Sequence, residues 1–580
     1  MNLELPRTMK PIVYYLSLLF IGALITSCKP GHPSADLLIF GGTIYTVEDT
    51  QPQVEAVAVR DGRVVFTGAM KDAETWVGEK TERLDLQGGT MTPGFIEGHG
   101  HLMGVGYYAL ELDLMDATSY EEIVERVRAA VAKAKPGEWI LGRGWHQDKW
   151  TTRPEKMVKG FQTHELLSAV SPDNPVFLRH ASSHAGFANA KAMELAGVNL
   201  LSIEKLQHDY TPEGGEIIRD DLGNPTGIFN EVAMGIIAKR IPPRTLETDA
   251  RALQLAMETC WKNGITGFHD AGATRDEIAL YHQFRKEGKL DLRLYVMVTG
   301  RDRPLVHEWL RRGPEIDSTG MLTIRSIKLN CDGALGSRGA WLLEPYTDRQ
   351  GFYGMATLPM DTVLSTSREA LTRGFQVCAH AIGDRANREI LDRYAQAFRE
   401  QPDKARGARF RIEHAQHLNP TDIPRFAELG VIPAMQAIHM SSDRPWAIER
   451  LGEKRIREGA YMWQSLLRSG VRIVNGTDTP VEPVNPIPCF YASITRKTLK
   501  GQPDGGYEPE EKMTRAQALR SYTTDAAYGA FEEGIKGTIA VGKLADFTVF
   551  TQDIMTAPED QILKTEVAVT VVGGKVVYRK

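Results

Sequence analysis

The sequence predicts an α/β fold: a (β/α)8 TIM barrel with a large insertion after strand 1, plus a small β-sandwich domain formed by both chain ends. Through the middle of the chain, short apolar runs alternate with amphipathic helical patterns, which is typical of such barrels. The two ends share short β-rich runs divided by glycine turns. The 580 residues are 42% hydrophobic and 25% charged, a composition typical of a globular protein and not of a disordered or collagen-like one.

The composite β-sandwich domain is expected over residues 35–90 and 533–580. Its candidate strands are at most six residues long. Gly-Gly or Asp-Gly pairs separate many of them, as in hairpins. Clear examples lie at residues 37–40, 43–47, 57–59, 545–550 and 567–569.

The barrel is expected over residues 91–532. Glycines that end helices come directly before several apolar runs, as at Gly264, Gly374 and Gly430. The long gap between the first two runs predicts an insertion at about residues 104–257. The eight candidate strands are residues 91–96, 265–268, 292–298, 322–329, 375–379, 409–413, 431–435 and 471–474.

The N-terminus has the pattern of an export signal. Arg7 and Lys10 precede an apolar run at residues 11–25, which is too short and wrongly flanked for a permanent membrane span. The run ends in Leu-Ile-Thr-Ser-Cys and resembles a bacterial lipoprotein box, with Cys28 as the lipidated residue. We therefore expect a lipoprotein signal peptide at residues 1–27 and an exported bacterial lipoprotein, membrane-anchored on the periplasmic or cell-surface side. The alternative is an ordinary signal with a chance cysteine.

Charge and cysteine content narrow the functional classes further. The formal net charge of -5 argues against a nucleic-acid partner, since phosphate binding needs a clustered basic surface. Contact with a membrane is expected through the lipid anchor only. The four cysteines after Cys28 lie in apolar settings without a Cys-x-x-Cys motif, so buried free thiols are expected, although export would permit disulfides.

Several candidate barrel strands end in side chains that bind metals. Active sites of such barrels lie where the strands end at their carboxyl side, so these side chains should meet. Each one alone could be a packed histidine, a turn aspartate or a lysine whose amine reaches solvent. The set comprises His99 and His101 after the first strand, Lys328 in the fourth, His380 after the fifth, His414 after the sixth and Asp478 after the eighth.

The motifs around these residues resemble those of the metal-dependent amidohydrolases, within them the YtcJ-like branch that includes N-substituted formamide deformylase. The resemblance runs from about residue 35 to residue 580 and is specific in combination. It covers the segments 93–101, 139–145, 328–338, 380–384, 411–416, 476–481 and 537–547.

The resemblance implies a divalent metal centre of the zinc type with one or two ions. His99, His101 and Asp478 would hold one ion, and His380 and His414 a second. Lys328, if carboxylated by CO2, would bridge them. Imidazole and carboxylate suit zinc, which lowers the pKa of a bound water towards neutrality.

Two positions depart from the commonest family pattern. Glu97 stands where an aspartate usually precedes the histidine pair, and Thr477 replaces the usual serine. Neither change removes a ligand, but Glu97 alters the groups that surround the ligands.

These residues together indicate a hydrolase that acts on carbon–nitrogen bonds other than peptide bonds. The metal-activated hydroxide would attack an amide-like carbon of a small molecule, an N-substituted formamide being one candidate, and Asp478 would carry the proton to the leaving nitrogen. One alternative is a deaminase or cyclic-amide hydrolase acting on a nitrogen heterocycle. The other is a non-catalytic, metal-bearing binding lipoprotein.

Several further residues are candidates for substrate contact. Two lie in the insertion, one ends the second strand, two follow the seventh strand, and one lies in the loop after the fourth. Structural roles are at least as common for such residues, and large aromatics more often belong to a core. These candidates are Trp145, His184, His269, Gln436, His439 and Tyr346.

Overall fold

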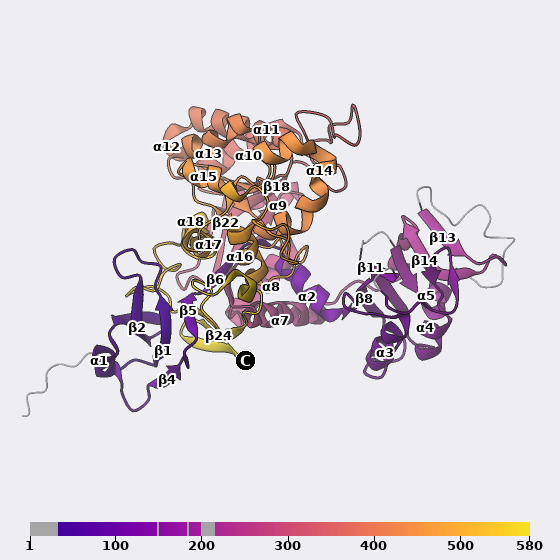
Figure 1. Cartoon of the computed structure of the whole chain (residues 1–580), viewed down its shortest axis with the longest axis horizontal. Coiled ribbons are helices and arrows are strands. Elements are labelled where there is room, and N and C mark those ends of the chain that lie inside the picture. The colour runs from indigo at the N-terminus through magenta and orange to yellow at the C-terminus, as the bar shows by residue number, and fades with distance from the viewer. Residues whose placement is uncertain (1–32, 148–149, 182–184, 199–214) are drawn as a thin grey trace, which may run out of the picture.

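The computed structural model describes residues 33–147, 150–181, 185–198 and 215–580. The expected signal peptide, Cys28 and His184 lie outside these residues. Figure 1 shows a central barrel, a sheet near both chain ends on one side of it, and a separate α/β body on the other side.

The barrel consists of eight strands in sequence order, and all seven hydrogen-bonded neighbour pairs are parallel. This confirms the predicted barrel. The strands are β6 (Phe95–Gly100), β15 (Ile265–Ala273), β16 (Arg293–Thr299), β18 (Leu322–Asn330), β19 (Gln376–Ala381), β20 (Arg411–His414), β21 (Ile432–Met435) and β22 (Val474–Asn475).

Backbone hydrogen bonds between the end of β6 and the loop after β22 bring the first and last strands together. The amide of His101 donates to the Thr479 carbonyl at 2.7 Å, and the amide of Asp478 donates to the His99 carbonyl at 2.8 Å. A Cβ atom at Gly98 would lie 2.3 Å from the Asn475 carbonyl oxygen, so only glycine permits this approach. The closure of the barrel therefore places residues 99 and 478 side by side.

The predicted first barrel strand, residues 91–96, is in fact parts of two strands. Residues Thr90–Pro93 form β5 of the terminal sheet, and β6 begins at Phe95. Gly94 separates them, and its amide donates to the Asp546 carbonyl at 2.8 Å. The Pro93-Gly94 pair, which is typical of turns, was the signal for this change of sheet.

Strands from both chain ends are hydrogen-bonded in one sheet, in the order β25-β24-β23-β5-β1-β2-β3, with β4 paired to β1. The β1–β2 ladder is irregular between Phe40 and Ile44; β1 pairs with β4 before this point and with β5 after it. The packing of this sheet as a two-layered sandwich stays a prediction. The remaining strands are β1 (Leu37–Tyr45), β2 (Gln53–Arg60), β3 (Arg63–Gly68), β4 (Glu82–Asp85), β23 (Phe547–Phe550), β24 (Val567–Val572) and β25 (Lys575–Arg579).

Between β6 and β15 the chain forms a six-stranded sheet with its own apolar core. The chain leaves the barrel through α2 (Leu102–Leu110) and returns through α7 (Leu246–Lys262), and these two helices lie against each other (Figure 1). The body contains β7 (Leu112–Asp113), β8 (Ile140–Trp145), β11 (Val176–His180), β12 (Ala185–Ala188), β13 (Gly215–Arg219), β14 (Pro225–Glu231), α3 (Tyr120–Val131), α4 (Glu165–Val170), α5 (Ala190–Leu195) and α6 (Met234–Ala238).

Helices follow most barrel strands, and α8 begins with a capping box at Thr274 and Glu277. No described helix is long and apolar enough to cross a membrane. The main barrel helices are α8 (Arg275–Lys286), α9 (Arg303–Arg312), α10 (Met360–Arg373), α11 (Asp384–Glu400), α13 (Ile423–Leu429), α14 (Ala437–Gly459), α15 (Trp463–Arg468), α16 (Pro486–Thr495), α17 (Arg515–Tyr522) and α18 (Thr524–Gly529).

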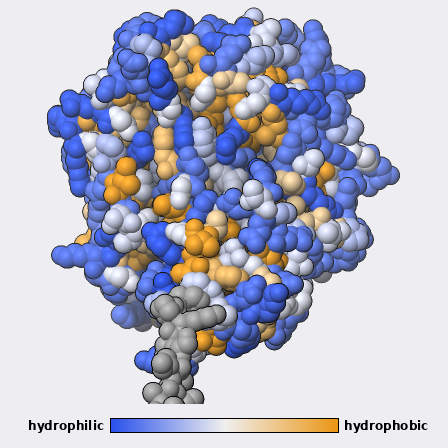
Figure 2. All heavy atoms as spheres, turned by 90° about the vertical axis from the view of Figure 1, so that its left-hand side faces the viewer, coloured by the Kyte–Doolittle hydropathy of each residue, from blue (hydrophilic) through white to orange (hydrophobic). Residues whose placement is uncertain are grey.

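The polarity of the surface and the state of the cysteines agree with the sequence analysis. On the face shown in Figure 2, hydrophilic residues cover much of the surface and hydrophobic ones are interspersed, as is usual for globular proteins. The four cysteines of the described chain are free and buried, as expected; they are Cys260, Cys331, Cys378 and Cys489.

The contact between α2 and α7 leads to a stability prediction. A Cβ atom at Gly106 would lie 2.0 Å from the Ala252 carbonyl oxygen, so the Gly106→Ala substitution must push the helices apart. We expect a loss of about 1–3 kcal/mol in the free energy of unfolding, measured by urea denaturation. Gly235→Ala in α6 is the control, because its Cβ atom would meet nothing within 4 Å. Equal stability of the two variants would contradict the close packing.

Candidate metal centre

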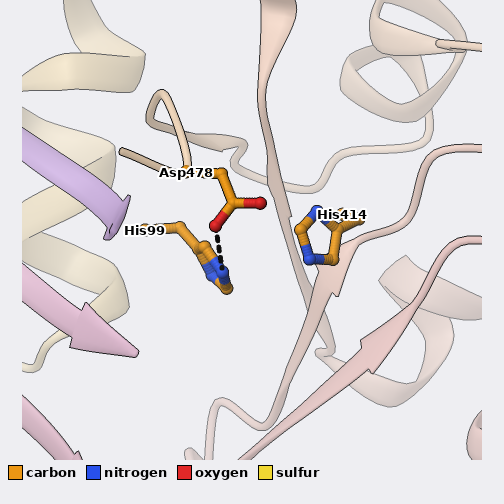
Figure 3. A group of neighbouring side chains, drawn as sticks. All are labelled: His99, His414 and Asp478. Atoms are coloured by element: carbon orange, nitrogen blue, oxygen red, sulfur yellow. Dashed lines mark ion pairs between the residues drawn. The ribbon is translucent and has the colours of Figure 1, made fainter. Parts of the chain in front are cut away.

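The six predicted metal ligands lie at the carboxyl ends of the barrel strands or just after them. Figure 3 shows three of them, His99, His414 and Asp478, whose side chains point toward one another from different strands. One ligand atom from each lies within 4.8 Å of the others, and all three residues are buried. The distance from His99 Nε2 to Asp478 Oδ1 is 3.5 Å.

The other three predicted ligands surround this group. His101 Nε2 lies 3.3 Å from Asp478 Oδ1, and Lys328 Nζ lies 3.2 Å from His99 Nε2. The rings of His380 and His414 are 4.3 Å apart between centroids. The structure thus brings all six residues together. His99 and Asp478 belong to the ligand set predicted for one ion, and His414 belongs to the set predicted for the second. The division of the ligands between two ions therefore stays a prediction.

Two of the clustered residues have a backbone conformation that L-residues seldom adopt. The φ angles are +74° at His414 and +56° at Asp478, both in the left-handed region. Such a conformation costs on the order of 1–3 kcal/mol and persists only where the surroundings enforce it. Here the strand pairing of β20 and the closure hydrogen bond of Asp478 hold the backbone in place.

The orientation of His99 is set by a buried ion pair beneath it. His99 Nδ1 is hydrogen-bonded to the Glu413 carboxylate, which leaves Nε2 directed at Asp478. Arg411 holds Glu413 with two hydrogen bonds, from Nε at 2.7 Å and from Nη2 at 2.9 Å. Arg411 Nη2 also donates to the Gly98 carbonyl at 2.8 Å. A histidine whose Nδ1–H is held by a carboxylate presents a fixed Nε2 lone pair to a metal.

The pKa shifts agree with this assignment. Burial would raise the pKa of the Glu413 carboxyl, but the adjacent Arg411 outweighs it and holds this pKa well below its usual value. Burial, reinforced by the charge of Lys328, lowers the pKa of His99 to about 4. At neutral pH His99 is therefore a neutral imidazole beside an ionised Glu413, as a metal ligand must be.

Gln436 fixes the second buried histidine. His414 Nδ1 lies 2.8 Å from Gln436 Oε1, while Gln436 Nε2 donates to the Ala434 carbonyl at 3.2 Å. These two contacts place the amide oxygen of Gln436 toward His414. They leave the Nε2 atom of His414 free for a metal. Burial lowers the pKa of His414 well below its usual value. Gln436 was predicted to contact substrate; the structure instead commits its side chain to His414.

The two departures from the family pattern, Glu97 and Thr477, are hydrogen-bonded to each other across the closure of the barrel. The Glu97 carboxylate accepts from the Thr477 amide at 2.6 Å and from its hydroxyl at 3.0 Å, and it also lies 3.3 Å from the His99 amide. Burial raises the pKa of Glu97 to about 8. This pair links the strand that carries His99 to the loop that carries Asp478.

Lys328 is buried, and burial lowers its pKa from the usual value. A lower pKa increases the share of neutral amine, which is the form that reacts with CO2. Its Nζ atom already lies beside His99 at the centre of the ligand group.

The donor set fits a divalent metal ion. Asp478 Oδ1 and His380 Nε2 are enclosed and form no well-aligned hydrogen bond within the described chain; their charged neighbours are His101 Nε2, 3.3 Å from Asp478 Oδ1, and Asp332 Oδ1, 3.4 Å from His380 Nε2. Buried polar atoms without a partner are rare and call for a bound group. Neutral imidazoles and a carboxylate are the ligands that zinc-type ions prefer, so these atoms suit such an ion.

The remaining predicted substrate contacts are buried away from a cavity. His269 is fully buried, and its Nδ1 lies 3.0 Å from Arg411 Nη1, so it belongs to the layer beneath the ligands. Trp145 is fully buried in the insertion and donates to the Leu178 carbonyl at 2.8 Å. Tyr346 is equally buried, with its hydroxyl bound to the Ala340 carbonyl. Substrate contact by these three residues stays a prediction; His184 lies outside the described residues.

The sequence analysis missed the groups that hold the ligands. Arg411 and Glu413 lie two residues apart in β20, so their side chains share one side of the strand, and opposite charges at such a spacing in a predicted barrel strand were an available signal. Asp332 was also missed. Its carboxylate accepts backbone hydrogen bonds from Trp341, Ile382 and Gly383 and lies 3.4 Å from His380 Nε2.

A buried His/Asp cluster at the carboxyl ends of a parallel barrel defines a metal-dependent hydrolase. The model of the Amidohydrolase family matches residues 82–578. The chain is 32% identical to the putative amidohydrolase YtcJ of Bacillus subtilis (strain 168), over 93% of this chain and 99% of that protein. The chain belongs to the amidohydrolase family, and it is an enzyme, a hydrolase acting on carbon–nitrogen bonds.

Two further comparisons agree. The chain is 27% identical to N-substituted formamide deformylase of Arthrobacter pascens, over 94% of this chain and 98% of that protein. The crystal structure of an uncharacterized metal-dependent hydrolase from Pyrococcus horikoshii OT3 superposes with a TM-score of 0.70 at 27% identity, covering 90% of this chain and 99% of that one.

The Glu413 contact predicts a loss of metal affinity on mutation. Glu413→Gln leaves Arg411 without its counter-charge and weakens the hold on His99, so we expect the zinc affinity to fall about 10- to 100-fold. Competition with a chromophoric chelator measures it. Glu400→Gln is the matched control, because Glu400 forms a two-bond pair with Arg368 at the surface. Unchanged affinity in Glu413→Gln would refute the orienting role.

The Glu97–Thr477 pair predicts an energetic coupling. Glu97→Met removes the acceptor of both hydrogen bonds and Thr477→Val removes the hydroxyl donor, so the double variant should lose less stability than the sum of the single variants. We expect an interaction energy of about 0.5–3 kcal/mol in a double-mutant cycle of urea unfolding. Additive losses would show that the two residues act independently.

Proposed function

We propose that this enzyme hydrolyses the amide-like C–N bond of a small, non-peptide molecule, with N-substituted formamides as the first class to test. The observation that carries this proposal is the ligand group of His99, His414 and Asp478 at the carboxyl end of the barrel. The similarity to N-substituted formamide deformylase along nearly the whole chain supports the substrate class.

The proposed cofactor is a divalent ion of the zinc type, one or two in number, held by His99, His101, His380, His414 and Asp478. When bound, such an ion polarises a carbonyl and lowers the pKa of a water molecule to near neutrality. A carboxylated Lys328 would complete the donor set, and the burial of its amine, which lowers the pKa of Lys328, supports this modification.

Asp478 is the proposed proton carrier. Burial would favour its protonated form, but the contact with His101 and the neighbouring histidines outweigh burial and hold the pKa of Asp478 well below its usual value. Its carboxylate is therefore available to accept a proton from water. Its Oδ1 atom, which lies 3.3 Å from His101 Nε2, can take that proton and release it to the leaving nitrogen.

The proposed location is outside the cytoplasm, on a membrane surface. The charged start, the apolar run at residues 11–25 and the lipobox-like Cys28 support an exported lipoprotein. Substrate would then reach the enzyme on the periplasmic or cell-surface side.

The proposal predicts metal-dependent formate release from N-butylformamide, lost on chelation and restored by zinc. Asp478→Asn should lower kcat about 10²- to 10⁴-fold because the proton carrier is gone, while circular dichroism shows an unchanged fold. Asp384→Asn is the control, since Asp384 accepts a hydrogen bond from the Leu343 amide outside the ligand group. Full activity of Asp478→Asn would refute the role of Asp478. Ammonia release from a heterocycle without acid release would instead favour a deaminase.

A further inference from the structure

One buried histidine beside the ligand group has no role in holding the metal ligands. His439 lies in the first turn of α14, directly after the strand β21 and after Gln436. Its ring is nearly parallel to that of His414, with an interplanar angle of 12° and a centroid distance of 6.2 Å. The side chain therefore borders the ligand group on the β21 side.

The Nε2 atom of His439 is enclosed and has no hydrogen-bond partner within the described parts of the chain. The residue is 8% exposed. A buried polar atom without a partner is destabilising by about 1–3 kcal/mol, so a histidine retained for packing alone would be expected to have one. The position beside the metal ligands suggests that the partner is a bound molecule.

Neighbouring polar groups on the same side are already paired. Gln416 Nε2 lies 3.1 Å from the Tyr461 hydroxyl and 3.4 Å from Asp443 Oδ2. Arg444 Nη2 donates to Glu508 at 2.7 Å. These contacts are satisfied within the protein and leave His439 available.

His439 and Ser441, the other nearby residue with an unpaired polar group, face different sides of α14. The Ser441 hydroxyl also lacks a partner in the described structure, but residues two apart in a helix do not face the same side. Asp443 is four residues after His439 and shares its side of the helix.

We infer that His439 is a substrate-binding residue whose Nε2 hydrogen-bonds the amide group of a small secondary amide while the scissile carbon faces the ligand group. This inference rests on the proposed function and specifies its substrate class. The Nε2 atom of a histidine donates or accepts one hydrogen bond according to the tautomer, and a secondary amide carries both an N–H and a carbonyl, so either tautomer finds a partner on the amide.

The test compares zinc-loaded wild type, His439→Ala and His439→Gln with N-butylformamide as substrate. Loss of the hydrogen bond in His439→Ala should raise KM about 10- to 100-fold with kcat and zinc content little changed. His439→Gln, which can still donate and accept, should recover part of the KM. Calorimetry with N-butylurea, a hydrolysis-resistant probe with the same N–H and carbonyl, measures Kd. The Kd should be lowest for wild type, intermediate for His439→Gln and highest for His439→Ala.

His417→Ala is the matched control. His417 is also buried and neither of its ring nitrogens has a hydrogen-bond partner in the described chain, but it lines a separate cavity of about 360 Å³ with Leu418 and Arg455. Its removal should leave KM and the N-butylurea Kd unchanged, even if stability falls.

The outcomes separate the two proposals. If zinc-loaded wild type binds N-butylurea through His439 but hydrolyses no amide, the proposed function fails while the binding role stands. If wild type hydrolyses N-butylformamide and His439→Ala leaves KM and Kd unchanged, the binding role is overturned. Loss of zinc from His439→Ala, or an equal rise in KM in His417→Ala, would also overturn it, because the effect would then be structural.

Discussion

The site depends on the buried ion pair between Arg411 and Glu413 inside the barrel. Taking two charges out of water is costly, and removing one partner of such a pair typically destabilises a protein by about 3–5 kcal/mol. In this chain the pair is fully enclosed, and each charge has a further task. Glu413 holds His99, while Arg411 binds the carbonyl of Gly98 and lies beside His269. One ion pair thus connects β20 with β6 and β15, and it fixes the orientation of a metal ligand.

The closure of the barrel is the second constraint. His99 and Asp478 are separated by most of the chain, and they meet because β6 and the loop after β22 exchange backbone hydrogen bonds. The Glu97–Thr477 contact strengthens the same connection from within. Glu97 and Thr477 thus act together at this connection, because one carboxyl group accepts from both the amide and the hydroxyl of Thr477.

Sequence reasoning located the barrel strands and the six candidate ligands that the structure brings together, because both depend on local patterns. Apolar runs between helices mark strands, and polar residues at their carboxyl ends must meet at one face. The failures concern side-chain neighbours that local patterns do not specify. Trp145 and Tyr346 could equally line a pocket or a core, and only tertiary packing shows that both are buried. Likewise, the roles of Gln436 and Glu413 depend on contacts with residues from other strands.

The most direct test of this account is anomalous diffraction at the zinc absorption edge from crystals of the zinc-loaded protein. The account predicts an anomalous peak among His99 Nε2, His414 Nε2 and the Asp478 carboxylate, within about 2.0–2.2 Å of each ligand atom it binds. His99 should keep its Nδ1 contact with Glu413 in that crystal. A zinc-loaded crystal with no peak at these residues, or with zinc bound only elsewhere, would contradict the central claim.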